Sequence, residues 1–161
     1  MKKYYALTAL SLFVGLYIYT IYRSEQTVVN VLLRTFLGAN FLLYKTKLHV
    51  FDALPDCVLY NLPSSLWLFA ATLLMRNLYF GRLHLAFLPL FFVIFLEISQ
   101  YLHFTNGTYD GLDAVFGAIF AAFAFGIKCP FLPQKATEKP FLRVFLCFFV
   151  GAIVFLAEFW G

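Results

Sequence analysis

The sequence predicts an all-α integral membrane protein, a polytopic bundle of transmembrane helices, and two observations support this prediction. Of the 161 residues, 63% are hydrophobic and 12% are charged, whereas soluble domains have about 45–50% apolar and about 25% charged residues. The apolar residues also gather in long runs, several of them long enough to cross a hydrocarbon core of about 30 Å. In such a chain the net charge of +4 reports on the sidedness of the loops and does not call for nucleic acid.

Five apolar runs are predicted to be spans within one membrane domain, residues 1–161: residues 4–22, 62–80, 85–101, 110–127 and 141–160. The first run lacks a small-residue cleavage site, so we expect an uncleaved signal anchor. Asn61 and Pro63 suit the start of the second span. Pro89 predicts a kink in the third.

Residues 27–44 are apolar but carry Asn30, Arg34 and Gly38 at four-residue spacing, which places a polar stripe on one face of a helix. Three alternatives are open: the segment spans the membrane, enters and returns, or lies in the interface as an amphipathic helix. We favour a segment that does not span, because five spans put Lys2 and Lys3 on the same side as the other basic loops.

The basic residues predict which side each loop faces. Residues 76–82 and 128–143 contain six of the twelve Lys and Arg, whereas the turn between Tyr101 and Asp113 contains none. Cytoplasmic loops are enriched in Lys and Arg. We therefore expect a multi-pass protein of the cytoplasmic membrane, with the N-terminus inside and residues 97–113 outside.

Residues 97–113 carry the candidate catalytic groups, which are Glu97, Asp110 and Asp113. Ionisable residues at membrane depth are costly, so they indicate function. Glu97 and Gln100 share one helix face at i, i+3, and small residues after Asp113 let a second helix approach closely. Converging carboxylates are suited to general acid and base chemistry or to a divalent cation.

Structural interpretations of the same residues stay open. Asp110 is placed to cap the N-terminus of a helix, and Asp113 lies in its first turn, where a carboxylate stabilises the helix dipole. Glu97 lies near a helix C-terminus, where the dipole opposes its charge, and Arg34 is a candidate partner for it.

Glu97-x-x-Gln100, followed by Asp110-x-x-Asp113 and a helix of small residues, resembles the VanZ-like family of small bacterial membrane proteins. The segments around Asn40 and Asn61 fit the same pattern, so the resemblance covers about residues 30–126. It implies a cytoplasmic-membrane protein, and the founding member of the family is linked to teicoplanin resistance; it implies no established reaction. The chain differs from the usual pattern at Leu43, Gly107 and Gly117.

The resemblance adds Asn40 and Asn61 to Gln100 as candidate substrate-binding residues, and Arg34 and Asp56 complete that set on the external side. No pattern identifies a cofactor or a set of metal ligands. Whether the chain is an enzyme is left open.

Three functions are consistent with these residues. The first is an envelope protein whose outer acidic pocket binds or modifies a lipid-linked, anionic or peptidoglycan-related substrate, with an effect on glycopeptide susceptibility. The second is a small ion or proton site in transport. The third is an assembly subunit that docks a membrane partner through small residues, namely Gly117, Ala121, Ala114 and Ala118.

Overall fold

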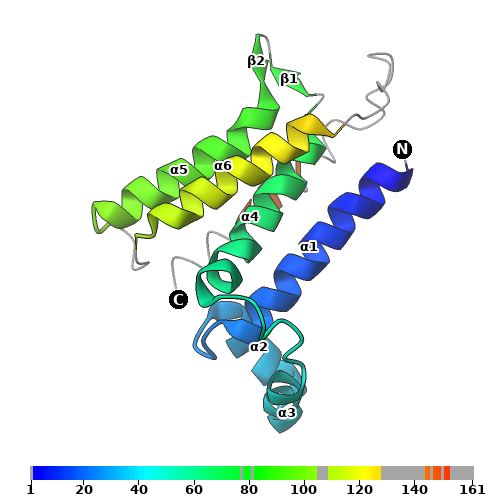
Figure 1. Cartoon of the computed structure of the whole chain (residues 1–161), viewed down its shortest axis with the longest axis vertical. Coiled ribbons are helices and arrows are strands. Elements are labelled where there is room, and N and C mark those ends of the chain that lie inside the picture. Colours follow the sequence, from blue (N-terminus) through cyan, green and yellow to red (C-terminus); the bar gives the residue numbers. More distant parts are fainter. Residues whose placement is uncertain are drawn as a thin grey trace.

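The computed structural model describes residues 2–76, 78–80, 82–104, 109–127, 144–145, 147–149 and 151–152. The predicted all-α class is confirmed, because helices make up nearly all of the regular structure (Figure 1). They are α1 (Lys2–Tyr22), α2 (Val28–Leu37), α3 (Ala39–Lys47), α4 (Asp56–Met75), the 3₁₀ helix η1 (Leu85–Phe87), α5 (Leu88–Tyr101) and α6 (Gly111–Gly126). The turn expected between α4 and α5 is a small antiparallel hairpin of β1 (Tyr79–Phe80) and β2 (Leu83–His84).

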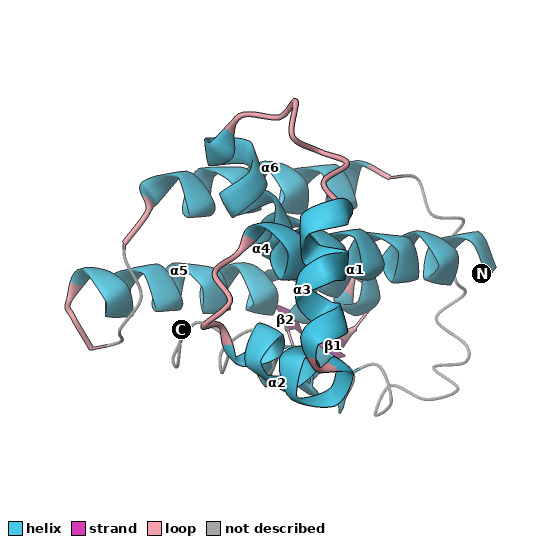
Figure 2. Cartoon of the chain, turned by 90° about the horizontal axis from the view of Figure 1, so that it is seen from below, coloured by secondary structure: helices cyan, strands magenta, loops and turns pink. Residues whose placement is uncertain are grey.

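Helix α4 is the centre of the bundle. Its residues from Trp67 to Met75 are all buried, and α1 and α6 pack extensively against it. Helix α1 runs antiparallel to α4, since Gly15 lies against Pro63 and Leu66 while Arg23, beyond the end of α1, donates a hydrogen bond to the Tyr60 carbonyl. Figure 2 views this arrangement from the end that carries α2 and α3.

Helices α4 and α6 run parallel to each other. Asn61 bonds to Asp110, Ser64 bonds to Asp113, and Leu68 touches the position where a Gly117 side chain would begin. All three pairs are 49 residues apart, so the two helices advance together. Consequently, the N-termini of both helices lie at one end of the bundle.

In the described part of the chain, two helices are long and apolar enough to cross a membrane, α1 over Tyr5–Tyr22 and α4 over Asp56–Met75. Helices α5 and α6 have 14 and 16 residues, which at about 1.5 Å per residue gives roughly 21 and 24 Å. Both are apolar, although each is shorter than a hydrocarbon core of about 30 Å. The described residues of the fifth expected span, 141–160, are helical between 144 and 152.

Both proline predictions were wrong. Helix α4 begins at Asp56, directly after Pro55, so Pro63 lies inside the helix. The hydroxyls of Ser64 and Ser65 both lie within hydrogen-bond distance of the Asn61 carbonyl, whereas the carbonyl that Pro63 leaves without its helical N–H donor is that of Leu59, four residues earlier. Pro89 lies in the first turn of α5, where its missing N–H breaks no helical bond, so it causes no kink.

The ambiguous segment 27–44 is two short helices instead of one span. Gly38 separates α2 from α3 with φ +62° and ψ −146°, a conformation that side-chain-bearing residues rarely adopt. With 10 and 9 residues, neither helix can cross a bilayer. Both lie at the same end of the bundle as the start of α4 (Figure 1).

Candidate functional site

A group of polar side chains fills the junction where the N-terminal part of α4, the C-terminal part of α5 and the start of α6 meet. This polar cluster consists of Asn61, Ser64, Glu97, Asp110 and Asp113. Glu97 Oε2 accepts a hydrogen bond from the Asp110 backbone N–H at 3.3 Å. Asn61 Nδ2 donates to Asp110 Oδ2 at 3.4 Å, and Ser64 Oγ donates to Asp113 Oδ1 at 2.8 Å. Three helices therefore bring three carboxylates together.

The N-terminus of α6 explains part of this gathering. Asp110 is its N-cap, and Asp110 Oδ1 accepts from the Leu112 N–H at 2.9 Å. The capping interpretation of Asp110 is thus confirmed. A helix N-terminus carries about half a positive charge, which also favours Asp113 in the first turn and Glu97 beside Asp110. One capping residue is enough to satisfy the free N–H groups that a side chain can reach at a helix N-terminus. Three carboxylates are therefore more than capping of α6 requires.

Helix α4 supplies the hydrogen-bond donors of the cluster. Asn61 is 1% exposed, and its Nδ2 donates both to the Cys57 carbonyl at 2.7 Å and to Asp110. Ser64 Oγ lies within hydrogen-bond distance of both the Asn61 carbonyl and Asp113. The amide and the hydroxyl thus tie the turn around Pro63 to α6.

Helix α5 supplies the most deeply buried carboxylate. Glu97 is 7% exposed and Gln100, one helical turn further on, is 6% exposed. Among the residues that the structure describes, Gln100 Oε1 has no hydrogen-bond partner, and the same is true of Asn61 Oδ1. Buried polar atoms are normally hydrogen-bonded. Both of these atoms are acceptors, and Asn61 lies directly beside a carboxylate.

The end of α5 directs the chain into the cluster. His103 adopts φ +56°, its N–H donates to the Gln100 carbonyl, and the Phe104 N–H donates to the Ser99 carbonyl. This pair of bonds around a left-handed residue is a Schellman motif, which usually has glycine at that position. Tyr101 and Tyr109 then pack edge to face with ring centres 5.5 Å apart, so the two ends of the turn lie close together.

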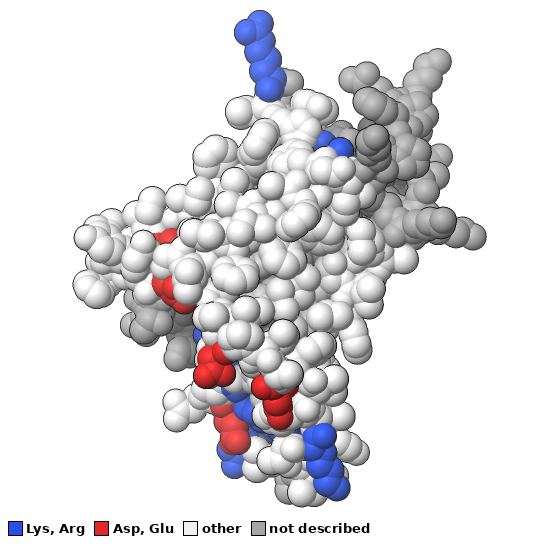
Figure 3. Space-filling model, viewed as in Figure 1, with Lys and Arg blue, Asp and Glu red and all other residues white. Residues whose placement is uncertain are grey.

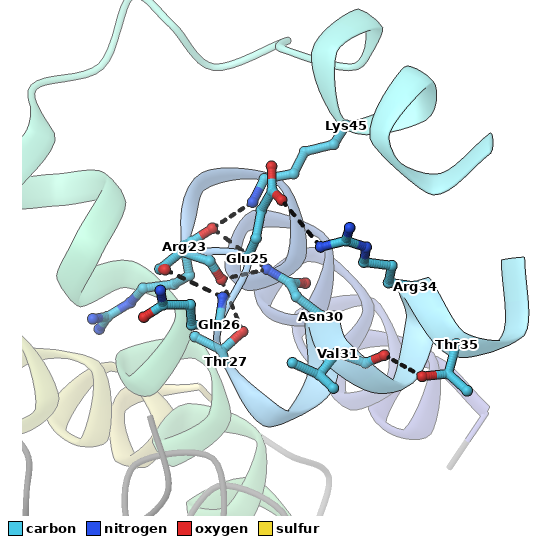
Figure 4. Close-up of polar contacts among 10 residues, drawn as sticks. Arg23, Glu25, Gln26, Thr27, Asn30, Val31, Arg34, Thr35 and Lys45 are labelled. Carbon is cyan, nitrogen blue, oxygen red and sulfur yellow. Dashed lines mark hydrogen bonds and ion pairs between the residues drawn. The ribbon is translucent and has the colours of Figure 1, made fainter. Parts of the chain in front are cut away.

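A second polar region joins α2 and α3 to the end of α1 (Figure 4). Asn30 Nδ2 donates to the Ser24 carbonyl at 2.8 Å, and Lys45 Nζ donates to the Arg23 carbonyl at 2.7 Å. Arg34 lies 4.0 Å from Glu25, and both side chains are about half exposed or more. Arg34 therefore pairs with Glu25, and the interpretation that it compensates Glu97 was wrong, because α2 carries it toward the 23–27 turn.

Two other candidate residues lie apart from the cluster. Asn40 is exposed in the first turn of α3, and Asp56 is exposed in the first turn of α4. Asp56 precedes Asn61 by five residues in a helix of 3.6 residues per turn. Their side chains therefore point in directions about 140° apart around the helix axis. The structure thus unites Glu97, Asp110, Asp113 and Asn61, with Gln100 on the adjoining turn.

The small residues of α6 pack inside the chain. A side chain at Gly117 would begin 2.9 Å from Leu68 Cδ2, and Ala121 belongs to the core around Trp67 and Leu68. The expectation that Gly117 and Ala121 dock a partner is therefore corrected, because α4 occupies that face. Of the other two, Ala114 is half-buried and Ala118 is exposed.

Sequence reasoning missed Ser64 and the contribution of α4 to the site. The signal was present, since Asn61 and Ser64 stand at i, i+3 in an apolar helix. Within the described ranges, no group of three His, Cys, Asp or Glu side chains is arranged to hold a metal ion. The oxygens of the polar cluster are instead distributed around a helix N-terminus.

Charge is unevenly distributed over the molecule. In Figure 3 the Asp and Glu atoms lie on the lower and left parts of the visible face, whereas Lys and Arg atoms lie both at the bottom and at the top. The acids there belong to the 23–27 and 51–55 turns, the start of α4 and the polar cluster.

No protein-family model, curated protein or solved structure matches the chain. Function is therefore inferred from the geometry of the site.

Proposed function

We propose that this chain is a VanZ-like envelope protein that crosses the cytoplasmic membrane five times with its N-terminus inside. The length and apolar character of α1 and α4 support this topology. So does the charge pattern of the sequence: Lys2, Lys3, Arg76 and Arg82 belong to the end opposite the polar cluster, and four more Lys and Arg follow α6 between residues 128 and 143, against Arg23, Arg34, Lys45 and Lys47 at the cluster's end. Basic residues favour the cytoplasmic side, which puts the polar cluster on the outer side.

In this proposal the polar cluster binds the headgroup of a lipid-linked or peptidoglycan-related substrate. The observation that carries it is the gathering of three carboxylates at one helix N-terminus, with Glu97 buried at 7% exposure and Asp110 and Asp113 part-exposed. A headgroup rich in hydroxyl or amino groups supplies donors for the part-exposed carboxylates of Asp110 and Asp113. Carboxylate acceptors form the stronger class of hydrogen bond, so such a headgroup would be held firmly.

The basic side chains of α2 and α3 suit the anionic part of the same substrate. Arg34, Lys45 and Lys47 lie at the same end of the bundle as the polar cluster. The Arg34–Glu25 pair is solvent-exposed at 4.0 Å, and such pairs contribute little stability. A phosphate group can therefore compete for Arg34 at small cost.

Binding to purified variants tests the proposal. Glu97→Gln and Asp113→Asn keep the size of each side chain but remove the charge. We expect each to weaken binding of a lipid-linked peptidoglycan precursor, in lipid nanodiscs, by about tenfold to a hundredfold, the equivalent of one hydrogen bond to a charged group. Asp56→Asn is the matched control, an exposed acid at the same end of the bundle, and should bind as the wild type does.

A cellular measurement checks the same residues. In a deletion strain, the wild-type chain and Asp56→Asn should restore the glycopeptide susceptibility profile, whereas Glu97→Gln and Asp113→Asn should not. Equal membrane abundance of all four proteins is the control. Full restoration by both cluster variants, together with unchanged precursor binding, would overturn the proposal.

A further inference from the structure

Helix α2 buries a polar side chain and exposes apolar ones. Asn30 is 0% exposed, whereas Val31, Leu32 and Phe36 are 49%, 53% and 83% exposed. These three residues and Thr35 form the outward face of the helix. A surface helix of a soluble protein has the reverse arrangement, because its apolar stripe packs against the core. The outward face of α2 therefore suits apolar surroundings and not water.

The polar groups on and beside the outward face also suit an apolar environment. Thr35 carries the only hydroxyl in α2 and donates it to the Val31 carbonyl at 2.8 Å, a bond to the preceding turn that Ser and Thr make in membrane helices. Arg34 follows Asn30 by four residues and Val31 by three, so it lies at the boundary between the buried and outward faces. Its side chain is 60% exposed. A basic side chain at such a boundary can extend to lipid phosphates while its stem stays in the apolar layer.

Helix α2 lies beside the bundle, close to one end of it. Figure 2 looks onto the end that carries α2 and α3, and α2 lies at the lower margin of the described helices, beyond α1 and α5. The polar cluster is at this same end, which the proposed topology places on the outer side of the membrane. A helix of 10 residues, about 15 Å long, lies in this position level with the outer leaflet.

The turn at Gly38 keeps the segment at the membrane surface. Arg34 precedes the turn, Asn40 follows it, and both side chains are exposed. Charged and polar side chains are costly in the hydrocarbon core, and irregular backbone is not exposed to lipid there. The segment therefore does not enter the core and return, and α2 lies along the interface.

We propose that α2 is an interfacial anchor whose outward face is embedded among the phospholipids of the outer leaflet, with Arg34 at the level of their phosphates. Lipid fits this face better than a protein partner does, because an apolar face with a basic boundary is the combination that binds bilayer surfaces. Asn30 and Lys45 bond to carbonyls of residues 23 and 24, so the anchor holds the turn after α1 at a fixed depth. The inference rests on the membrane location in the proposed function and is independent of the polar cluster and its substrate.

Spin labels measure what surrounds the outward face. The three cysteines, Cys57, Cys129 and Cys147, are replaced by alanine, and single labels are attached to Leu32→Cys and Phe36→Cys in vesicles of phosphatidylglycerol and phosphatidylcholine. We expect oxygen, which concentrates among acyl chains, to relax both labels more strongly than a water-soluble nickel chelate does. Gln26→Cys and Asn40→Cys are the matched controls, exposed polar positions on either side of α2, and should show the opposite order.

The unsubstituted chain supplies a second readout that needs no cysteine replacement. Phe36 is 83% exposed in the protein alone, yet hydroxyl-radical footprinting in the same vesicles should leave its ring largely unoxidised. Extensive oxidation of Phe36 would overturn the inference.

Two results with the spin labels would also overturn it. Stronger relaxation by the nickel chelate at positions 32 and 36 would place the face in water, and weak relaxation by both reagents would place it under protein. Phe13→Cys, at a 68% exposed position of α1, separates this inference from the proposed topology. If the label at position 13 meets oxygen while the labels on α2 meet water, the anchor alone fails. If the label at position 13 also meets water, the membrane crossing fails.

Discussion

Two polar regions lie at the same end of this molecule and differ in what their side chains bond to. In the region that joins α2 and α3 to α1, Asn30 and Lys45 donate to backbone carbonyls of residues 23 and 24. In the polar cluster, Asn61 and Ser64 donate to carboxylates carried by another helix. Bonds to the backbone fix the path of the chain, whereas bonds between side chains of different helices position chemical groups.

Both regions also contain a buried asparagine whose Oδ1 has no partner, Asn30 at 0% exposure and Asn61 at 1%. Of the two, only Asn61 bonds to a carboxylate, through its Nδ2. The comparison therefore predicts that Asn30 affects stability alone, and that Asn61 affects stability and binding together.

Asn61→Ala should have the largest effect on stability. It removes the bond to the Asp110 carboxylate and the bond to the Cys57 carbonyl, and it leaves a part-buried charge with one partner fewer. Loss of hydrogen bonds to charged groups costs about 1.5–3 kcal/mol. Thermal unfolding in detergent should show that loss, and precursor binding should fall in parallel. Normal binding by the folded variant would break the comparison.

Gly117→Ala should cost about 1–3 kcal/mol, the usual effect of overpacking. The new methyl would begin 2.9 Å from Leu68 Cδ2, and Leu68 is fully buried, so either the Leu68 side chain must shift or α4 and α6 must move apart. Gly126→Ala is the control, since an added side chain there meets nothing within 4 Å. Thermal unfolding of both variants measures the difference, and equal stability of the two would contradict the close packing.

Asn30→Ala should cost about 1 kcal/mol, a typical value for a neutral hydrogen bond. The Arg23 carbonyl keeps its bond from Lys45, and the Ser24 carbonyl keeps its bonds from the Thr27 N–H and hydroxyl, so neither carbonyl loses its last donor. Thermal unfolding should register the change while precursor binding stays at the wild-type level. A fall in binding as large as that of Asn61→Ala would show that the two regions do not differ in role.

His103→Gly should have the smallest effect, and of opposite sign. His103 adopts φ +56°, and the left-handed conformation costs a residue with a side chain roughly 1–2 kcal/mol that glycine avoids. Part of this gain is lost because glycine is more flexible in the unfolded chain. We expect a melting temperature equal to or slightly above wild type, with His103→Val clearly below it.

Sequence patterns predicted the helical class and much of the site because both depend on local rules. The run of apolar residues located α1, and Asp110 before an apolar helix located an N-cap that the structure confirms. The spacing of Gly117 and Ala121 predicted a closely packed neighbour, which is α4. These features depend on residues within one or two turns of each other.

What sequence patterns missed depends on tertiary contacts. Pro63 indicates a helix start, yet α4 begins at Asp56 and continues through Pro63, where it packs against Gly15 of α1. Arg34 was assigned to Glu97 when Glu25 is its partner. The position of α2 relative to the 23–27 turn determines which carboxylate Arg34 contacts. The spacing of residues along the sequence does not determine that position.

The parallel pairing of α4 and α6 has a mechanical consequence. The two helices are joined at one end by Asn61 and Asp110, in the middle by Leu68 against Gly117, and at the other end by Arg76, whose guanidinium donates to the Ala124 and Ile127 carbonyls. Sliding or rotation of one helix against the other would break all three attachments at once. The pair should therefore move as one rigid body, and any opening that admits a ligand falls to α5, which brings Glu97 to the pair from outside.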